Sequence, residues 1–107
     1  MTQGTRKFEF ATVYNVVDGD TCDMEIDLGF SVKTKHRFRL SRINTPERGE
    51  QGWKEATDKL KELVLGKQVV IYSDKIDKYG RYLAEIAVGE TNVNDTLLTE
   101  GFAKPYV

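Results

Sequence analysis

Acidic residues and arginines gather beside turn-forming residues in three short segments of the chain. These segments are 17–21 (Val-Asp-Gly-Asp-Thr), 39–47 (Arg-Leu-Ser-Arg-Ile-Asn-Thr-Pro-Glu) and 77–81 (Asp-Lys-Tyr-Gly-Arg). Hydrolysis of a phosphodiester accumulates negative charge on the phosphoryl oxygens, which a hard cation and guanidinium groups can stabilise. A nearby carboxylate can orient or deprotonate the attacking water. The three segments contain each of these groups and therefore indicate chemistry on phosphate.

The residue types indicate which group would bind a metal, a phosphate or the attacking water. Arginine suits phosphate because its planar fork meets two oxygens at once. The candidates are Asp20 and oxygens near Asn44 and Thr45 for a metal, Arg39 and Arg81 for phosphate, and Glu47 for water.

Each segment also has an interpretation without chemistry. Residues 18–20 form a good turn sequence, and residues 45–47 can begin a helix that favours Glu47 near its N-terminus. Arg39 can be one more exposed charge on a basic strand, and 77–81 only a loop around Gly80. The residues alone do not show that the segments meet in space.

Composition sets wider limits on the protein. The 107 residues are 39% hydrophobic and 31% charged, which indicates one globular domain, 1–107, and excludes a disordered or fibrous protein. The net charge of −1 lacks the basic excess usual in nucleic-acid binders. A function on nucleic acid would therefore depend on local clusters of charged residues. No apolar run reaches membrane-spanning length, and no signal peptide is visible. We expect a cytoplasmic protein without a membrane partner, or a secreted one if a leader was removed.

Cys22 is the only cysteine, so an intramolecular disulfide is excluded. No histidine lies near it in sequence, and we predict a small buried hydrophobe rather than a catalytic thiol. The solitary His36 falls on the apolar side of its strand and is expected to be packed rather than to act as a ligand or base.

Periodicity predicts the elements that position these segments. Alternating apolar residues predict strands over 8–17, 22–28 and 32–40. In the second strand the alternation places Cys22, Met24, Ile26 and Leu28 inside and Asp23, Glu25 and Asp27 outside. In the third it places Val32, His36, Phe38 and Leu40 inside and gives a basic outer face of Lys33, Lys35, Arg37 and Arg39. Helical spacing of Trp53, Ala56, Leu60, Leu63 and Val64 predicts a helix that Gly66 ends. Strands over 68–73 and 82–88 and a short helix over about 93–100 follow. The order βββ-α-ββ-α predicts a mainly β, α+β fold, the five-stranded OB-fold barrel, although a fold does not fix a function.

The three motifs, in this order, resemble the staphylococcal nuclease (thermonuclease) family. The resemblance runs from about Ala11 to Tyr106, and residues 93–104 resemble the family's penultimate helix. It implies a Ca²⁺-dependent phosphodiesterase, an endo- or exonuclease with little sequence preference that leaves 3′-phosphates. The implied partners are single-stranded or locally melted DNA and RNA, and we expect a monomer.

The resemblance also assigns roles to residues. Asp20 would bind calcium through its carboxylate and Thr45 through its backbone carbonyl, while Asp18 would lie behind the metal ligands. Arg39 and Arg81 would clamp the scissile phosphate, and Glu47 would activate water. The remaining substrate contacts would come from Lys78 and Tyr79 at the terminal phosphate, and from Tyr106 at the base or sugar.

Three departures from the family pattern qualify this assignment. Asn44 stands where the family often has a second metal-binding aspartate, the loop after Glu47 is short, and no further helix follows before Val107. The alternative function is a catalytically weak or inactive nucleic-acid-binding OB-fold module. The joint presence of Asp20, both arginines and Glu47 favours the enzyme.

Overall fold

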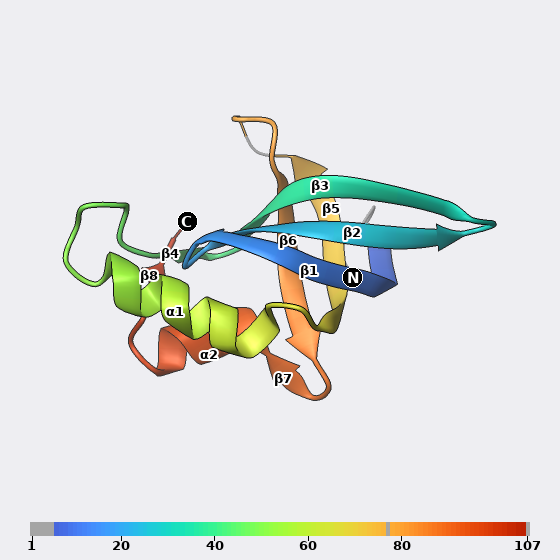
Figure 1. Cartoon of the computed structure of the whole chain (residues 1–107). Coiled ribbons are helices and arrows are strands. Elements are labelled where there is room, and N and C mark those ends of the chain that lie inside the picture. The colour runs from blue at the N-terminus through green and yellow to red at the C-terminus, as the bar shows by residue number, and fades with distance from the viewer. Residues whose placement is uncertain (1–5, 77, 107) are drawn as a thin grey trace.

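The computed structural model describes residues 6–76 and 78–106 as a β-barrel with two helices packed beside it (Figure 1). The long strands are β1 (Arg6–Asp18), β2 (Thr21–Gly29), β3 (Val32–Leu40), β5 (Gln68–Ile76) and β6 (Tyr82–Val88). The helices are α1 (Trp53–Val64) and α2 (Val93–Thr99). Three two-residue strands complete the structure: β4 (Ile43–Asn44), β7 (Thr91–Asn92) and β8 (Lys104–Pro105).

The long strands close into a mixed barrel. Antiparallel neighbours run in the order β3-β2-β1-β5-β6, and a parallel pairing of β3 with β6 closes the circle. Phe38, Arg39 and Leu40 pair there with Tyr82, Leu83 and Ala84. The predicted α+β architecture and its five-stranded OB-fold barrel are confirmed, and the predicted element bounds differ from those observed by at most a few residues.

The β2–β3 hairpin projects past the barrel, which Figure 1 shows as a long two-stranded finger. Both Phe30 and Ser31 at its tip have left-handed backbone conformations, with φ of 56° and 63°. Leu28 and Val32 belong to the apolar series that the alternation predicted to be inside, but about half of each is exposed. That prediction is wrong at the tip because both faces of a ribbon beyond the barrel rim meet solvent.

The outer face of β3 is basic, as predicted, but it is not an isolated positive surface. Three of its basic residues lie opposite acids of β2, in the register Asp23–Arg37, Glu25–Lys35 and Asp27–Lys33, whereas Arg39 lies opposite Thr21. The opposed acids reduce the attraction that this strand can exert on a polyanion.

Asp23 is buried, although the alternation predicted it on the outer face. Its carboxylate accepts hydrogen bonds from Arg37 Nε at 2.7 Å and Nη2 at 3.1 Å, and from Asn15 Nδ2 at 3.0 Å. These bonds, chiefly those from Arg37, lower the pKa of Asp23. The polar partners explain how a charge can be buried beneath neighbouring side chains.

Helix α1 follows its predicted bounds and buries Ala56, Leu60 and Val64 against the barrel. It ends where Gly66 adopts a left-handed conformation and donates its N–H to the Val13 carbonyl at 2.8 Å. Neither helix of the described chain is long and apolar enough to cross a membrane.

Helix α2 is tied to the barrel by the fully buried Asn94. Its Oδ1 accepts from Ile86 N at 3.0 Å, while its Nδ2 donates to the carbonyls of Ser41 at 2.9 Å and Ala84 at 3.1 Å. One amide therefore joins the helix to β6 and to the chain leaving β3, from which residues 39–47 continue.

Candidate functional site

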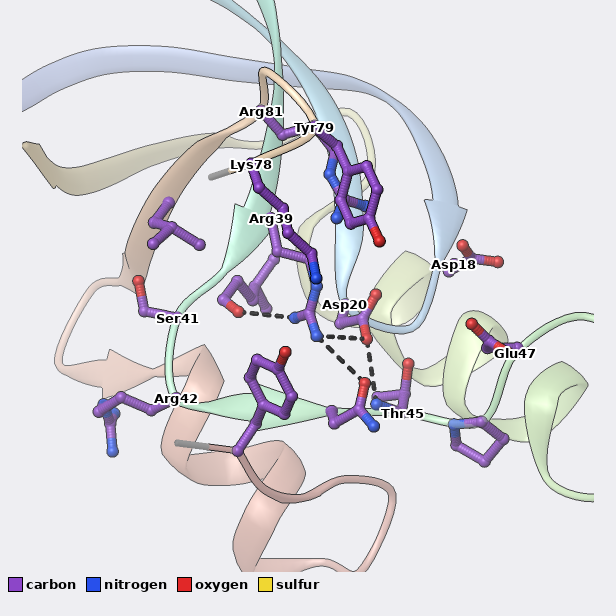
Figure 2. A pocket seen from close by; sticks show the side chains of 15 residues that line it. Asp18, Asp20, Arg39, Ser41, Arg42, Thr45, Glu47, Lys78, Tyr79 and Arg81 are labelled. Atoms are coloured by element: carbon purple, nitrogen blue, oxygen red, sulfur yellow. Dashed lines mark hydrogen bonds and ion pairs between the residues drawn. The ribbon is translucent and has the colours of Figure 1, made fainter. Parts of the chain in front are cut away.

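The three predicted segments converge on one cavity of about 660 Å³. Figure 2 shows this cavity with carboxylates on one side and cationic side chains on another. Every side chain that the sequence assigned to a site lines it: Asp18, Asp20, Arg39, Asn44, Thr45, Glu47, Lys78, Tyr79, Arg81 and Tyr106. Asp77, the first residue of the third motif, lies outside the described residues. The fold thus supplies the spatial convergence that the sequence could not show.

Asp20 is buried at the centre of this arrangement. Its Oδ1 accepts from Thr21 Oγ1 at 2.9 Å, and its Oδ2 accepts from the backbone N–H of Thr45 at 3.0 Å. Arg39 Nη2 lies 3.4 Å from the same Oδ2. The carboxylate therefore links the β1–β2 turn to the second motif.

Gly19 lets this turn approach α1 closely. A Cβ at this position would lie 2.7 Å from the Cβ of Ala56 and 3.0 Å from Thr45 Oγ1. No left-handed conformation is involved, so the glycine is required for packing rather than for its backbone angles. Residues 18–20 do form a turn, but the turn also holds two carboxylates against the rest of the cavity.

Arg39 is 8% exposed, which overturns the alternative that it is one more exposed charge on β3. Its Nη1 donates to the carbonyls of Leu40 at 2.9 Å and Ile43 at 2.8 Å. Its Nη2 donates to Asn44 Oδ1 at 3.1 Å, and the Tyr106 ring centre lies 5.4 Å from its Cζ. The guanidinium is fixed before any ligand arrives, as charge stabilisation in a transition state requires.

Oxygen donors for a hard cation occur next to Asp20. Among the side chains that the structure describes, in 6–73 and 78–106, no three His, Cys, Asp or Glu residues form a metal-binding group, so a cation site here would also need amide or backbone oxygens. Asn44 and Thr45 offer both, and Thr45 Oγ1 is buried without a hydrogen-bond partner. A set made of carboxylate, amide and carbonyl oxygens fits calcium.

Glu47 lines the cavity from a tight turn rather than from a helix start. Its N–H donates to Glu50 Oε1 at 2.7 Å, and its carbonyl accepts from Glu50 N at 2.9 Å. Helix α1 begins only at Trp53, so the interpretation of residues 45–47 as a helix start is wrong. Figure 2 places Glu47 near Asp18, on the side of Asp20 away from Arg81.

The loop before β6 brings cations and an aromatic ring to the opposite side (Figure 2). Lys78 Nζ and Arg81 Cζ each lie 5.3 Å from the centre of the Tyr79 ring, which is 71% exposed. Gly80 allows the loop to turn through a φ of 84°. The cavity therefore has an acidic side that suits a cation and a basic, aromatic side that suits a nucleotide.

Two contributors were not assigned to the site from sequence. Arg42 lines the cavity, but its guanidinium donates to Glu85 and Asp95, which raise its pKa. Trp53 was assigned to the helix core by its spacing, yet its Nε1 donates to Asp18 Oδ1 at 2.6 Å. Helical periodicity reports which face a side chain occupies and carries no information about the polar end of an indole.

Cys22 and His36 lie outside this cavity. Burial, followed by the neighbouring charge of Asp23, raises the pKa of the Cys22 thiol to about 12, which excludes a reactive thiolate near neutral pH. His36 Nε2 lies 2.7 Å from Thr34 Oγ1, and its ring packs edge-on against Tyr82. Both observations confirm the packing roles predicted for these residues.

Comparison with known proteins identifies a family and several relatives. The family described as staphylococcal nuclease homologue matches residues 37–107. An uncharacterized endonuclease of Escherichia coli O157:H7 is 34% identical over 95 residues, which cover 88% of this chain and 59% of the relative. A micrococcal nuclease of Shigella flexneri is 29% identical over 103 residues, covering 88% and 56%.

A plant relative shares a shorter region. The staphylococcal-like nuclease CAN1 of Arabidopsis thaliana is 39% identical over 75 residues, which cover 68% of this chain and 23% of the relative. The chain spans between half and two thirds of the length of the bacterial relatives it matches.

Proposed function

Because this chain belongs to the staphylococcal nuclease homologue family, we propose that it is a calcium-dependent phosphodiesterase that hydrolyses DNA and RNA. One observation carries the proposal: the oxygens of Asp20, Asn44 and Thr45 share a cavity with the guanidinium groups of Arg39 and Arg81. Hydrolysis of a phosphodiester uses both kinds of group, a cation site and fixed donors for the phosphoryl oxygens.

Calcium would be held by the Asp20 carboxylate, the Asn44 amide oxygen and the Thr45 backbone carbonyl. When bound, it supplies positive charge that polarises the phosphoryl group and lowers the pKa of a coordinated water. Asp18 adds a second carboxylate to this side of the cavity. The donor set is rich in oxygen and poor in nitrogen and sulfur, which favours a hard cation over a transition metal.

The protein's own groups act on substrate and water. Arg39, held by the carbonyls of Leu40 and Ile43, keeps its positive charge fixed at the cavity, where it would stabilise the charge of a phosphate. Arg81 offers a second guanidinium from the loop before β6. Glu47 acts as the general base or orients the water, since its side chain lines the same cavity as Asp20 and Thr45.

The substrate is single-stranded or locally melted nucleic acid. Tyr79 and Tyr106 are 71% and 57% exposed at the cavity, where a base or sugar can pack against their rings. Lys78 can contact a terminal phosphate. Contacts to phosphate and sugar carry no sequence information, so little sequence preference is expected, and both DNA and RNA are accepted.

The proposal is tested with a 5′-labelled oligonucleotide and a plasmid, each incubated with calcium or with a chelator. Calcium-dependent cleavage is expected, and phosphatase treatment should change the mobility of the labelled products because they end in 3′-phosphate. Calcium-independent binding without cleavage would contradict the proposal. It would favour the nucleic-acid-binding module, for which the uncharged Asn44 is the supporting observation.

A further inference from the structure

The indole of Trp53 joins the first turn of α1 to the carboxylate of Asp18, which lines the cavity. We propose that Trp53 is a positioning residue that holds Asp18 beside the calcium ligands, so that Asp18 strengthens calcium binding without being a ligand. This inference rests on the proposed function because it assumes that calcium binds at Asp20.

The contact is short and directional. Trp53 Nε1 donates to Asp18 Oδ1 across 2.6 Å, between residues 35 positions apart in the chain. A hydrogen bond to a charged acceptor is stronger than one between neutral groups. An indole N–H can only donate and a carboxylate oxygen accepts, so the direction of this bond is fixed.

The indole ring also has a guanidinium over one face. The Cζ of Arg48 lies 4.8 Å from the Trp53 ring centre, so the guanidinium of the loop after Glu47 stacks on it. Trp53 N donates to the Glu50 carbonyl at 3.2 Å, in the turn that also binds Glu47. The tryptophan therefore connects Asp18, on the cation side, to the loop that presents the proposed general base.

The two acids of the β1–β2 turn are held by different partners. Asp20 is bound by Thr21 and by the backbone of Thr45, whereas Asp18 is bound by the helix through Trp53. Between them Gly19 sits so close to Ala56 that a Cβ would clash at 2.7 Å. The turn thus has two separate attachments to α1, one by packing and one by a hydrogen bond to a carboxylate.

A fixed Asp18 carboxylate is expected to raise the affinity of the site for a cation. A carboxylate fixed next to the ligands contributes charge and accepts hydrogen bonds from cation-bound water, whereas a freely rotating one spends part of its time turned to solvent. Removal of an outer partner of a metal site typically lowers affinity about 10–100-fold. We expect a loss near the lower end because Asp18 keeps its charge when Trp53 is replaced.

The test measures how much calcium the protein needs to bind an oligonucleotide. The probe is a fluorescein-labelled phosphorothioate hexathymidylate, followed by anisotropy during calcium titration of the parent, Trp53→Phe, Asp18→Asn and the double variant. Trp53→Phe should raise the calcium midpoint about tenfold. The double variant should match Asp18→Asn alone, because Trp53 acts through Asp18.

Controls separate positioning from a general loss of structure. Thermal unfolding without calcium reports the stability of each variant, and Lys54→Met removes an exposed ion pair with Asp58 from the same helix without touching the cavity. Lys54→Met should leave the calcium midpoint unchanged. An unchanged midpoint in Trp53→Phe, or additive shifts in the double variant, would overturn the inference even if the parent cleaves nucleic acid.

Failure of the proposed function has a different signature. A parent that binds the probe in a calcium-dependent way but cleaves no oligonucleotide refutes the nuclease, while the midpoints still support the role of Trp53. A parent whose binding ignores calcium overturns both proposals.

Discussion

The side-chain oxygen of Asn44 accepts a hydrogen bond from Arg39, with 3.1 Å between Oδ1 and Nη2. The same oxygen is a candidate ligand for calcium, so the proposed cation and phosphate sites meet at one amide. Asp20 repeats this relationship, since its Oδ2 lies 3.4 Å from Arg39 Nη2. A change on the cation side is therefore expected to affect how the phosphate is held.

Lysine in place of Arg39 or Arg81 should cost far more activity than a surface arginine change. Lysine keeps the charge but loses the planar two-point contact. We expect a loss of about 2–4 kcal/mol in transition-state stabilisation, measured from kcat/KM on an oligonucleotide.

Arg39→Lys also removes the bonds to the carbonyls of Leu40 and Ile43, so thermal unfolding has to be measured beside it. The control is Arg6→Lys, at an exposed residue outside the cavity, which should leave kcat/KM unchanged. Cleavage by Arg39→Lys near the parent rate would remove Arg39 from the site.

Glu47→Gln keeps the shape of the side chain and removes its charge and most of its basicity. Because Glu47 lies in a turn before α1, the change should leave the helix intact and lower kcat strongly, with nucleotide binding nearly unchanged. Single-turnover cleavage and oligonucleotide anisotropy measure the two quantities. Glu55→Gln, exposed in the first turn of α1, is the control, and turnover retained in Glu47→Gln would exclude a role in activating water.

The barrel and both helices were predictable from the periodicity of apolar residues. The side chains that line the cavity were predictable from the three motifs and their order. Trp53 shows what periodicity omits, since its spacing places the ring on the helix face and says nothing of its bond to Asp18. Asp23 shows a second limit: alternation assigned it to solvent, yet Arg37 and Asn15 come from other strands to bury it. Contacts between distant segments decide such positions, and no local pattern encodes them.

The buried Asp23 should make the free energy of unfolding depend on pH in the acidic range. Hydrogen bonds from Arg37 lower its folded-state pKa below the unfolded value of about 3.9. Its stabilisation is therefore fully present above that pH and is lost as pH falls through the lowered folded pKa. Asp23→Asn should reduce the free energy of unfolding by about 1–3 kcal/mol at pH 7.

Urea unfolding at pH 7 and near pH 3 measures this difference. The gap between the parent and Asp23→Asn should narrow as the pH falls below about 3.9. The exposed Glu90, changed to Gln, serves as a control and should show no such pattern. A gap that stays constant with pH would contradict the assigned role of the Asp23 charge.

Asn94 should contribute more to stability than any exposed polar residue of α2. Alanine there leaves Ile86 N and the carbonyls of Ser41 and Ala84 without their partner. We expect a loss of about 2–4 kcal/mol in urea unfolding. Asn92→Ala removes the N-cap bond to Asp95 N and should cost only about 1 kcal/mol. Equal losses in the two variants would contradict the role of Asn94 as the residue that chiefly holds α2 to the barrel.

We expect Asn44 to set the calcium concentration that the protein needs. Calcium affinity is tuned by how many oxygen ligands carry charge, and Asn44 offers an oxygen without charge. With Asp20 as the charged ligand and Thr45 giving a backbone carbonyl, calcium binding should be weak and should tighten when a nucleotide phosphate adds negative oxygens. Asn44→Asp should therefore lower the calcium concentration at which cleavage is half-maximal.

The bond from Arg39 gives this substitution a second effect. An aspartate at position 44 would place a charge 3.1 Å from the Arg39 guanidinium, where it can hold the arginine as well as attract the cation. Calcium titration with and without a phosphorothioate oligonucleotide separates these effects, because cation attraction alone shifts the titration made without the oligonucleotide. Gln68→Glu changes the net charge equally at an exposed residue away from Asn44 and Thr45 and should leave both titrations unchanged. If Asn44→Asp leaves the calcium dependence of cleavage unchanged, Asn44 is not a ligand, and its amide serves only to hold Arg39.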